Sequence, residues 1–143
     1  MTTSSVTLVV RRVIAAPAAR LFDAWTEPAQ VLRWWGPRPV TCVAAEVDLK
    51  VGGKYRIGNR RPDGSLLWIF GEFEQIDRPR QLVYTWRIAE GAEAERVTVK
   101  FEPVATGTEV IVLHERIGSE TIRSGHEQGW IACLEGLALH AGS

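Results

Sequence analysis

The chain has 143 residues, of which 45% are hydrophobic, and this size and composition are typical of one globular domain covering residues 1–143. Its 17 basic and 17 acidic residues balance, and no block of like charge favours a nucleic-acid or anionic-membrane partner. No apolar run is long enough for a membrane span and the first residues lack a secretory pattern, so we expect a cytoplasmic protein.

The N-terminal part predicts one strand followed by two short helices. Val6 to Ala15 is rich in β-branched residues and is expected to be a strand at an edge or with a bulge. Pro17 is suited to the first position of a helix that should end near Thr26, because its missing N–H is not needed there. A second helix is predicted from Pro28, and Gly36 is placed to end it.

The middle of the chain predicts six consecutive strands, since short extended segments alternate with Gly and Pro turns. Short connections make neighbouring strands antiparallel, so these segments should form a meander in one curved sheet. The predicted segments are Val40 to Lys50, Lys54 to Arg61, Leu66 to Ile76, Gln81 to Ile88, Arg96 to Glu102 and Thr108 to Ile117.

The last segment, from Ser119 to Ala141, predicts a long helix with one apolar face. Residues of that face recur at steps of three or four, the spacing of a single helical stripe. The stripe is Ile122, His126, Trp130, Cys133 and Leu137. One long helix beside many strands predicts an α+β fold in which the sheet wraps around the C-terminal helix.

Several short motifs occur in an order that resembles a known family. They are Trp34-Trp35-Gly36-Pro37, Gly52-Gly53-Lys54-Tyr55-Arg56, Pro62-Asp63-Gly64, Leu82-Val83-Tyr84-Thr85-Trp86 and His126-Glu127-Gln128-Gly129-Trp130. With the order of elements, they resemble the helix-grip (START and Bet v 1-like) SRPBCC proteins grouped with the C-terminal domain of the activator of heat-shock protein 90 ATPase. One departure is Asp77-Arg78-Pro79-Arg80, where the family is expected to have two adjacent prolines.

The resemblance implies a cavity between sheet and long helix that holds an apolar or amphipathic small molecule. Six tryptophans are independently consistent with such a wall, because an indole contacts an apolar ligand and also offers an N–H. Core packing is the favoured role for any single one, but at least one of Trp35, Trp68, Trp86 and Trp130 is expected to line the pocket. The predicted ligand-binding residues are Trp35, Trp68, Tyr84, Trp86, His114, His126 and Trp130.

His126 is the expected polar anchor of this site. It lies on the inward stripe, where an imidazole can hydrogen-bond a ligand or transfer a proton, although a core histidine would show the same spacing. His114 is followed by Glu115, but adjacent strand residues face opposite ways, which argues against a catalytic pair. No catalytic residue is therefore assigned.

We expect neither a metal nor a cofactor. His114, His126 and His140 lack the spacing of a zinc site, and the chain has no phosphate-binding glycine loop and no nucleophile elbow. Cys42 and Cys133 lie far apart in sequence and are interpreted as small core residues without a structural disulfide.

Binding of a small hydrophobic or aromatic molecule is the favoured function. One alternative is an enzyme of the polyketide cyclase or aromatase kind, with His126 as acid or base. Another is a protein-interaction module related to chaperone ATPase activators, which would use the outer surface. A homodimer through a sheet edge or the two short helices stays an open alternative.

Overall fold

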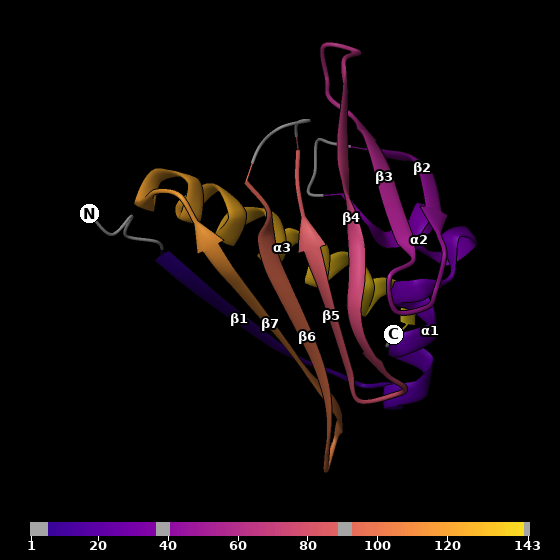
Figure 1. Ribbon diagram of the computed structural model, residues 1–143. Helices are drawn as coiled ribbons and strands as arrows, with labels where there is room; N and C mark the ends of the chain where they lie inside the picture. The colour runs from indigo at the N-terminus through magenta and orange to yellow at the C-terminus, as the bar shows by residue number, and fades with distance from the viewer. Residues whose placement is uncertain (1–5, 37–40, 89–92, 142–143) are drawn as a thin grey trace.

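The structure, a computed structural model, describes residues 6–36, 41–88 and 93–141. Seven strands and three helices follow the predicted order (Figure 1). The strands are β1 (Val6–Ile14), β2 (Thr41–Val47), β3 (Lys54–Arg60), β4 (Leu66–Asp77), β5 (Gln81–Trp86), β6 (Glu95–Val104) and β7 (Gly107–Ile117). The helices are α1 (Ala18–Thr26), α2 (Pro28–Trp34) and α3 (Glu120–Ala141). Pro37 and Val40, which the sequence placed in the turn and at the start of a strand, lie outside the described residues.

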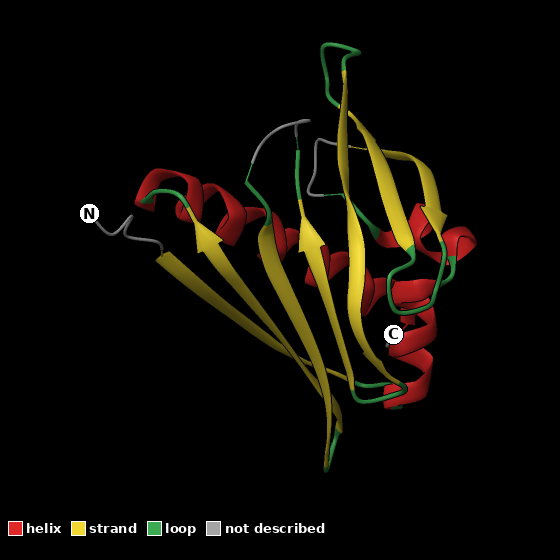
Figure 2. Cartoon of the chain, viewed as in Figure 1, coloured by secondary structure: helices red, strands yellow, loops and turns green. Residues whose placement is uncertain are grey.

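All seven strands form one antiparallel sheet in the order β1-β7-β6-β5-β4-β3-β2. The predicted meander from β2 to β7 is confirmed, and the first strand joins it by pairing with the last. β1 is therefore an edge strand, as expected. The sheet curves around α3, which runs across one of its faces (Figure 2).

The two short helices begin at the predicted prolines. Pro17 is the N-cap of α1, and Pro28 is the first residue of α2. Gly36 follows α2 with a φ of 116°, a conformation that glycine adopts without the strain that a Cβ would add. Helices α1 and α2 pack against each other and against α3, and α2 also packs against β2 at that end of the sheet (Figure 1).

The inward face of α3 starts one turn later than the sequence predicts. Trp130, Cys133 and Leu137 are buried, but Ile122 is 45% exposed. Only Gly118 and Ser119 separate β7 from α3, so the first helical turn lies at the rim of the sheet, beyond the core. No helix in the described part of the chain is long and apolar enough to cross a membrane.

Candidate functional site

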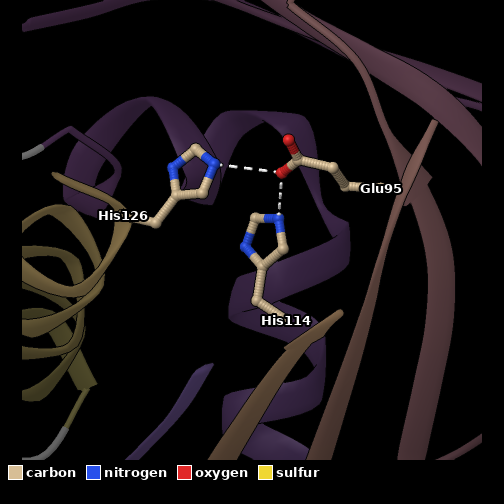
Figure 3. Close-up of side chains that lie close together, drawn as sticks. All are labelled: Glu95, His114 and His126. Atoms are coloured by element: carbon tan, nitrogen blue, oxygen red, sulfur yellow. Dashed lines mark hydrogen bonds and ion pairs between the residues drawn. The ribbon is translucent and has the colours of Figure 1, made fainter. Parts of the chain in front are cut away.

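Three titratable side chains meet between the sheet and α3: Glu95 of β6, His114 of β7 and His126 of α3 (Figure 3). Nε2 of His114 lies 2.6 Å from Oε1 of Glu95, and Nε2 of His126 lies 3.0 Å from the same oxygen. The two imidazole rings stack, with centroids 4.5 Å apart and planes inclined by 14°. Trp130 extends the cluster, because its Nε1 donates to Nδ1 of His114 over 3.0 Å.

Strand register explains why Glu95 reaches both histidines. Glu95 pairs with Trp86 of β5, while Val97, two residues further along β6, pairs with His114 of β7. Residues two apart share a sheet face, so all four side chains point toward α3. A bulge in β7, where Arg116 has a φ of 65°, follows His114 directly.

Hydrogen bonding determines which nitrogens carry protons. Burial alone would raise the pKa of Glu95, but bonds from His114 and His126 outweigh it and lower that pKa to about 2. Glu95 is therefore an ionised, acceptor-only group at neutral pH, and each histidine donates to it from Nε2–H. Burial lowers the pKa of His114 below its usual value. With Nδ1 accepting from Trp130, His114 is held neutral.

The cluster brings together the donors of a metal site but not its geometry. Glu95, His114 and His126 place their ligand atoms within 4.8 Å of one another, which the sequence spacing did not suggest. However, a metal on Nε2 of His114 would move the proton to Nδ1, which faces the N–H of Trp130, a group that can only donate. These residues do not fit a bound metal.

A cavity of about 200 Å³ lies beside the cluster, between the sheet and α3. Its wall is mainly apolar and aromatic. The lining residues are Trp35, Asn59, Arg61, Leu67, Ile69, Trp86, Ile88, Gly125, His126, Gly129, Trp130 and Cys133. Burial raises the pKa of the Cys133 thiol to about 12, so this cysteine is an inert wall residue and no nucleophile.

Three residues of this wall each carry a buried polar atom that has no hydrogen-bond partner. Among the described residues, the buried side-chain atoms without one are Nε1 of Trp35, Oδ1 of Asn59 and Nε1 of Trp86, and all three residues line the cavity. Other indoles of the core are paired: Trp25 donates to Tyr84, Trp34 to the Ala24 carbonyl and Trp130 to His114. Since buried polar groups are normally paired, these three atoms point to a missing partner.

Comparison with known proteins identifies the family. A model of the family described as "Activator of Hsp90 ATPase homolog 1-like protein" matches residues 15–142, which is most of the chain. The chain belongs to this family. The resemblance to SRPBCC proteins of the helix-grip fold is thereby confirmed. Membership of this family is consistent with a ligand-binding domain, but it specifies no ligand.

Solved structures of several bacterial proteins share the fold of this chain. Protein CV1439 from Chromobacterium violaceum has a TM-score of 0.88 at 23% identity, covering 94% of this chain and 96% of its own. The AHSA1 (SPO3351) protein from Silicibacter pomeroyi has a TM-score of 0.84 at 24% identity, with coverage of 94% and 96%. The AHSA1-like protein from Aeromonas hydrophila has a TM-score of 0.82 at 20% identity, with coverage of 94% and 91%. A search of curated proteins gave no match.

Four of the seven predicted site residues line the cavity of this AHSA1-like protein: Trp35, Trp86, His126 and Trp130. Tyr84 borders a much smaller neighbouring space of about 20 Å³, where its hydroxyl accepts from Trp25. His114 is fully buried behind the wall, between Glu95 and Trp130, and does not line the cavity.

Trp68 lies on the opposite face of the sheet from the other six residues. Its neighbour Ile69 points into the cavity, so Trp68 points outward, where the Arg56 guanidinium lies 4.7 Å above its ring. The hollow there is larger, about 920 Å³, but it is an open groove with several charged side chains. Arg56 is already paired with Glu46 at this groove, and none of the unpartnered buried atoms lies in it.

Two polar residues of the site were not among those the sequence singled out. Glu95 organises the histidine cluster, and Asn59 supplies the unpaired acceptor of the cavity wall. Glu95 lies in phase with Val97 and Val99 on the alternating strand β6, so its direction was detectable from the pattern. Asn59 likewise lies in phase with the buried residues Tyr55 and Ile57 of β3, so its inward direction was also detectable from the pattern.

Proposed function

We propose that the protein binds one small, largely apolar molecule, with a ring or fused pair of rings, in the cavity between the sheet and α3. The observation that supports this most strongly is the set of three unpartnered polar atoms in an otherwise apolar wall. Each such atom costs about 1–3 kcal/mol of folding free energy when it is left unpaired. Proteins accept such a cost where a ligand restores the bonds.

Water is a poorer occupant than an organic molecule. At about 30 Å³ per water, a cavity of about 200 Å³ holds roughly six or seven. Each would need two to four polar partners, and a wall made largely of indole and aliphatic groups offers far fewer. A single apolar body that carries a few polar atoms fits the wall better.

The unpaired atoms specify the polar groups of that molecule. Two indole N–H groups, from Trp35 and Trp86, require acceptors such as a carbonyl oxygen. The amide oxygen of Asn59 requires a donor such as a hydroxyl. The volume is below the range of about 300–1,000 Å³ that holds drug-sized ligands, which indicates a ligand of one or two rings.

The first experiment is native mass spectrometry of the protein purified from its own host, compared with the denatured sample. A defined small molecule in near-stoichiometric amount is the expected result. In parallel, quenching of tryptophan fluorescence is titrated with one- and two-ring phenols and aromatic ketones. A protein that retains no small molecule and binds no member of this panel would contradict the proposal and favour the protein-interaction alternative.

A matched pair of variants tests the location. Leu67 lines the cavity, whereas its neighbour Leu66 is exposed on the other side of β4. Leu67→Trp should fill the cavity and abolish binding, and Leu66→Trp should bind like the wild type. Equal affinity in both variants would place the ligand elsewhere.

A further inference from the structure

We propose that a molecule bound in this cavity is also a substrate, and that His126 is a general base that moves a proton between carbon atoms of a small carbonyl compound. The activity is the isomerisation of such a compound through its enolate. This inference rests on the proposed function, because it places the reaction in the same cavity.

The hydrogen bond to Glu95 determines which nitrogen of His126 can act as the base. Because Glu95 is ionised and can only accept, Nε2 of His126 carries its proton and donates it over 3.0 Å. In the neutral ring the lone pair is then on Nδ1, the nitrogen that faces away from Glu95 (Figure 3) and has no partner among the described residues. His126 itself lines the cavity, so this lone pair belongs to a residue in contact with the bound molecule.

The surroundings favour protonation of His126 during the reaction. The Glu95 carboxylate contacts the ring on the side opposite Nδ1 and stabilises the imidazolium that forms, as the orienting carboxylate of a catalytic triad does. His114, stacked on His126, is held neutral by Trp130 and therefore adds no second positive charge. Arg61, the remaining charged group of the cavity wall, is exposed to solvent.

The unpaired indoles provide the other requirement of enolate chemistry. Removal of a proton beside a carbonyl group moves negative charge onto the carbonyl oxygen, which needs hydrogen-bond donors that are already in place. Trp35 and Trp86 offer two such N–H groups with no competing protein partner. The ring centroids of Trp35 and Trp86 lie 6.2 Å apart, and that of Trp86 lies 5.8 Å from the centroid of His126, so the two indole rings and the imidazole ring border the same small space.

The proton balance needs no further reagent. Nδ1 of His126 takes a proton from the carbon next to the carbonyl, the C–H electron pair becomes the carbon–carbon double bond of the enolate, and the carbonyl pair moves to oxygen. The imidazolium then returns the proton to the same carbon or to the far end of a conjugated enolate, and the carbonyl reforms. Nothing is oxidised or reduced, and no leaving group is released.

The test follows exchange of the α-protons of 2-tetralone in D₂O by NMR, with binding measured on the same samples by tryptophan fluorescence. We expect bound 2-tetralone to exchange at least about 100-fold faster than in buffer, the range that a positioned base supplies. Binding without faster exchange would overturn the inference and leave the proposed function standing. Failure of 2-tetralone and of the whole phenol and ketone panel to bind would overturn both.

Variants separate the base from the scaffold. His126→Gln keeps a donor for Glu95 but has no basic nitrogen, so exchange should fall by about 100-fold while affinity changes only a few-fold. His140→Gln removes the histidine in the last turn of the same helix and should leave exchange unchanged. Trp86→Phe keeps an aromatic ring, though a smaller one, and loses the N–H, and should slow exchange by about 100-fold. Undiminished exchange in His126→Gln would contradict the assignment.

Glu95 acts through His126 and is a positioning residue. Glu95→Gln removes the charge that stabilises the imidazolium, so the maximal exchange rate should fall while the affinity for 2-tetralone changes only a few-fold. A purely structural role would weaken binding and exchange together, and this result would overturn the role given to Glu95.

Discussion

Asn59 is a polar residue that lies in the core at a position where an apolar side chain would pack more easily. It is 2% exposed, lies opposite Leu67 in the β3–β4 ladder, and its Oδ1 has no partner. Asn59→Leu should therefore raise the free energy of unfolding of the unliganded protein by about 1–3 kcal/mol, because an unpaired buried acceptor is removed. Urea unfolding measures the gain. The same variant should bind hydroxyl-bearing ligands more weakly in the fluorescence titration.

Thr108 provides the opposite case as a control. Its hydroxyl is fully buried but paired, donating to the carbonyl of Ala16 over 2.7 Å. Thr108→Val should lower stability by about 1–3 kcal/mol, because the Ala16 carbonyl loses its side-chain partner in a buried site. If Asn59→Leu destabilised the protein as much as Thr108→Val, the Asn59 oxygen would have a structural partner, and the argument for a ligand would lose its main support.

Single residues also show how far the sequence could lead to the site. The stripe of the last helix placed His126 and Trp130 correctly, since a period of 3.6 residues is visible along the chain. The meeting of Glu95 with His114 and His126 depends on which strands pair and in what register, and no local pattern encodes that. The sequence argued against a pair of the neighbours His114 and Glu115, and the carboxylate that accepts from His114 comes from another strand.

At the scale of elements, Gly125 and Gly136 of α3 have the same low helix propensity but different surroundings. A Cβ at Gly125 would meet nothing within 4 Å, but a Cβ at Gly136 would lie 2.6 Å from the carbonyl oxygen of Trp34. Gly125→Ala should raise the free energy of unfolding by about 0.5–1 kcal/mol through helix propensity. Gly136→Ala should lower it despite the same propensity gain, because α2 and α3 are forced apart. Thermal unfolding of both variants checks this.

The decisive result is which of the two variants, Gly125→Ala or Gly136→Ala, is the more stable. If Gly136→Ala were more stable than the wild type, α2 would be able to move away from α3 at no cost in stability. The close contact of α2 with α3 would then be unimportant for stability. The contact also holds Trp35, the residue after α2, against the cavity, so Gly136→Ala should weaken ligand binding as well.

Elements were predicted better than the details of their ends and faces. Gly and Pro turns divided the meander into strands whose bounds differ from the predicted ones by a few residues, because such turns have local conformational causes. The bulge at Arg116 could not be predicted, since a positive φ at a non-glycine residue has no sequence signal there. The outward direction of Trp68 was equally ambiguous, because both faces of β4 carry apolar and polar residues.

At the scale of the whole molecule, the site gathers residues that lie far apart in the sequence. Its wall extends from Trp35 after α2 to Cys133 in α3, and the cluster beside it adds Glu95 of β6 and His114 of β7. Such a site forms only when the sheet is complete and α3 has docked. The free energy of the buried cluster is therefore part of the global stability, and the titration of Glu95 should appear in the unfolding of the entire protein.

The sign of that contribution follows from the pKa of Glu95, about 2 in the folded protein against a usual value of 4.5. A lowered carboxyl pKa stabilises the fold above pH 4.5, and the contribution is lost as the pH falls from 4.5 to about 2. A shift of this size corresponds to about 3 kcal/mol. His114 also lowers stability in acid. Its pKa is lower in the folded protein than in the unfolded chain, so the unfolded chain binds a proton more readily as the pH falls below the usual histidine pKa of 6.5.

Urea unfolding of the wild type and Glu95→Gln across this pH range tests the linkage. The variant should be about 3 kcal/mol less stable at pH 7, and the difference should shrink between pH 4.5 and pH 2 as the wild-type carboxylate is protonated. Glu102→Gln, at an exposed position of the same strand, is the control and should differ little from the wild type at any pH. If the difference in the free energy of unfolding between the wild type and Glu95→Gln stayed constant down to pH 2, the charge of Glu95 would not stabilise the fold. The hydrogen bonds from the two histidines would then not depend on an ionised carboxylate.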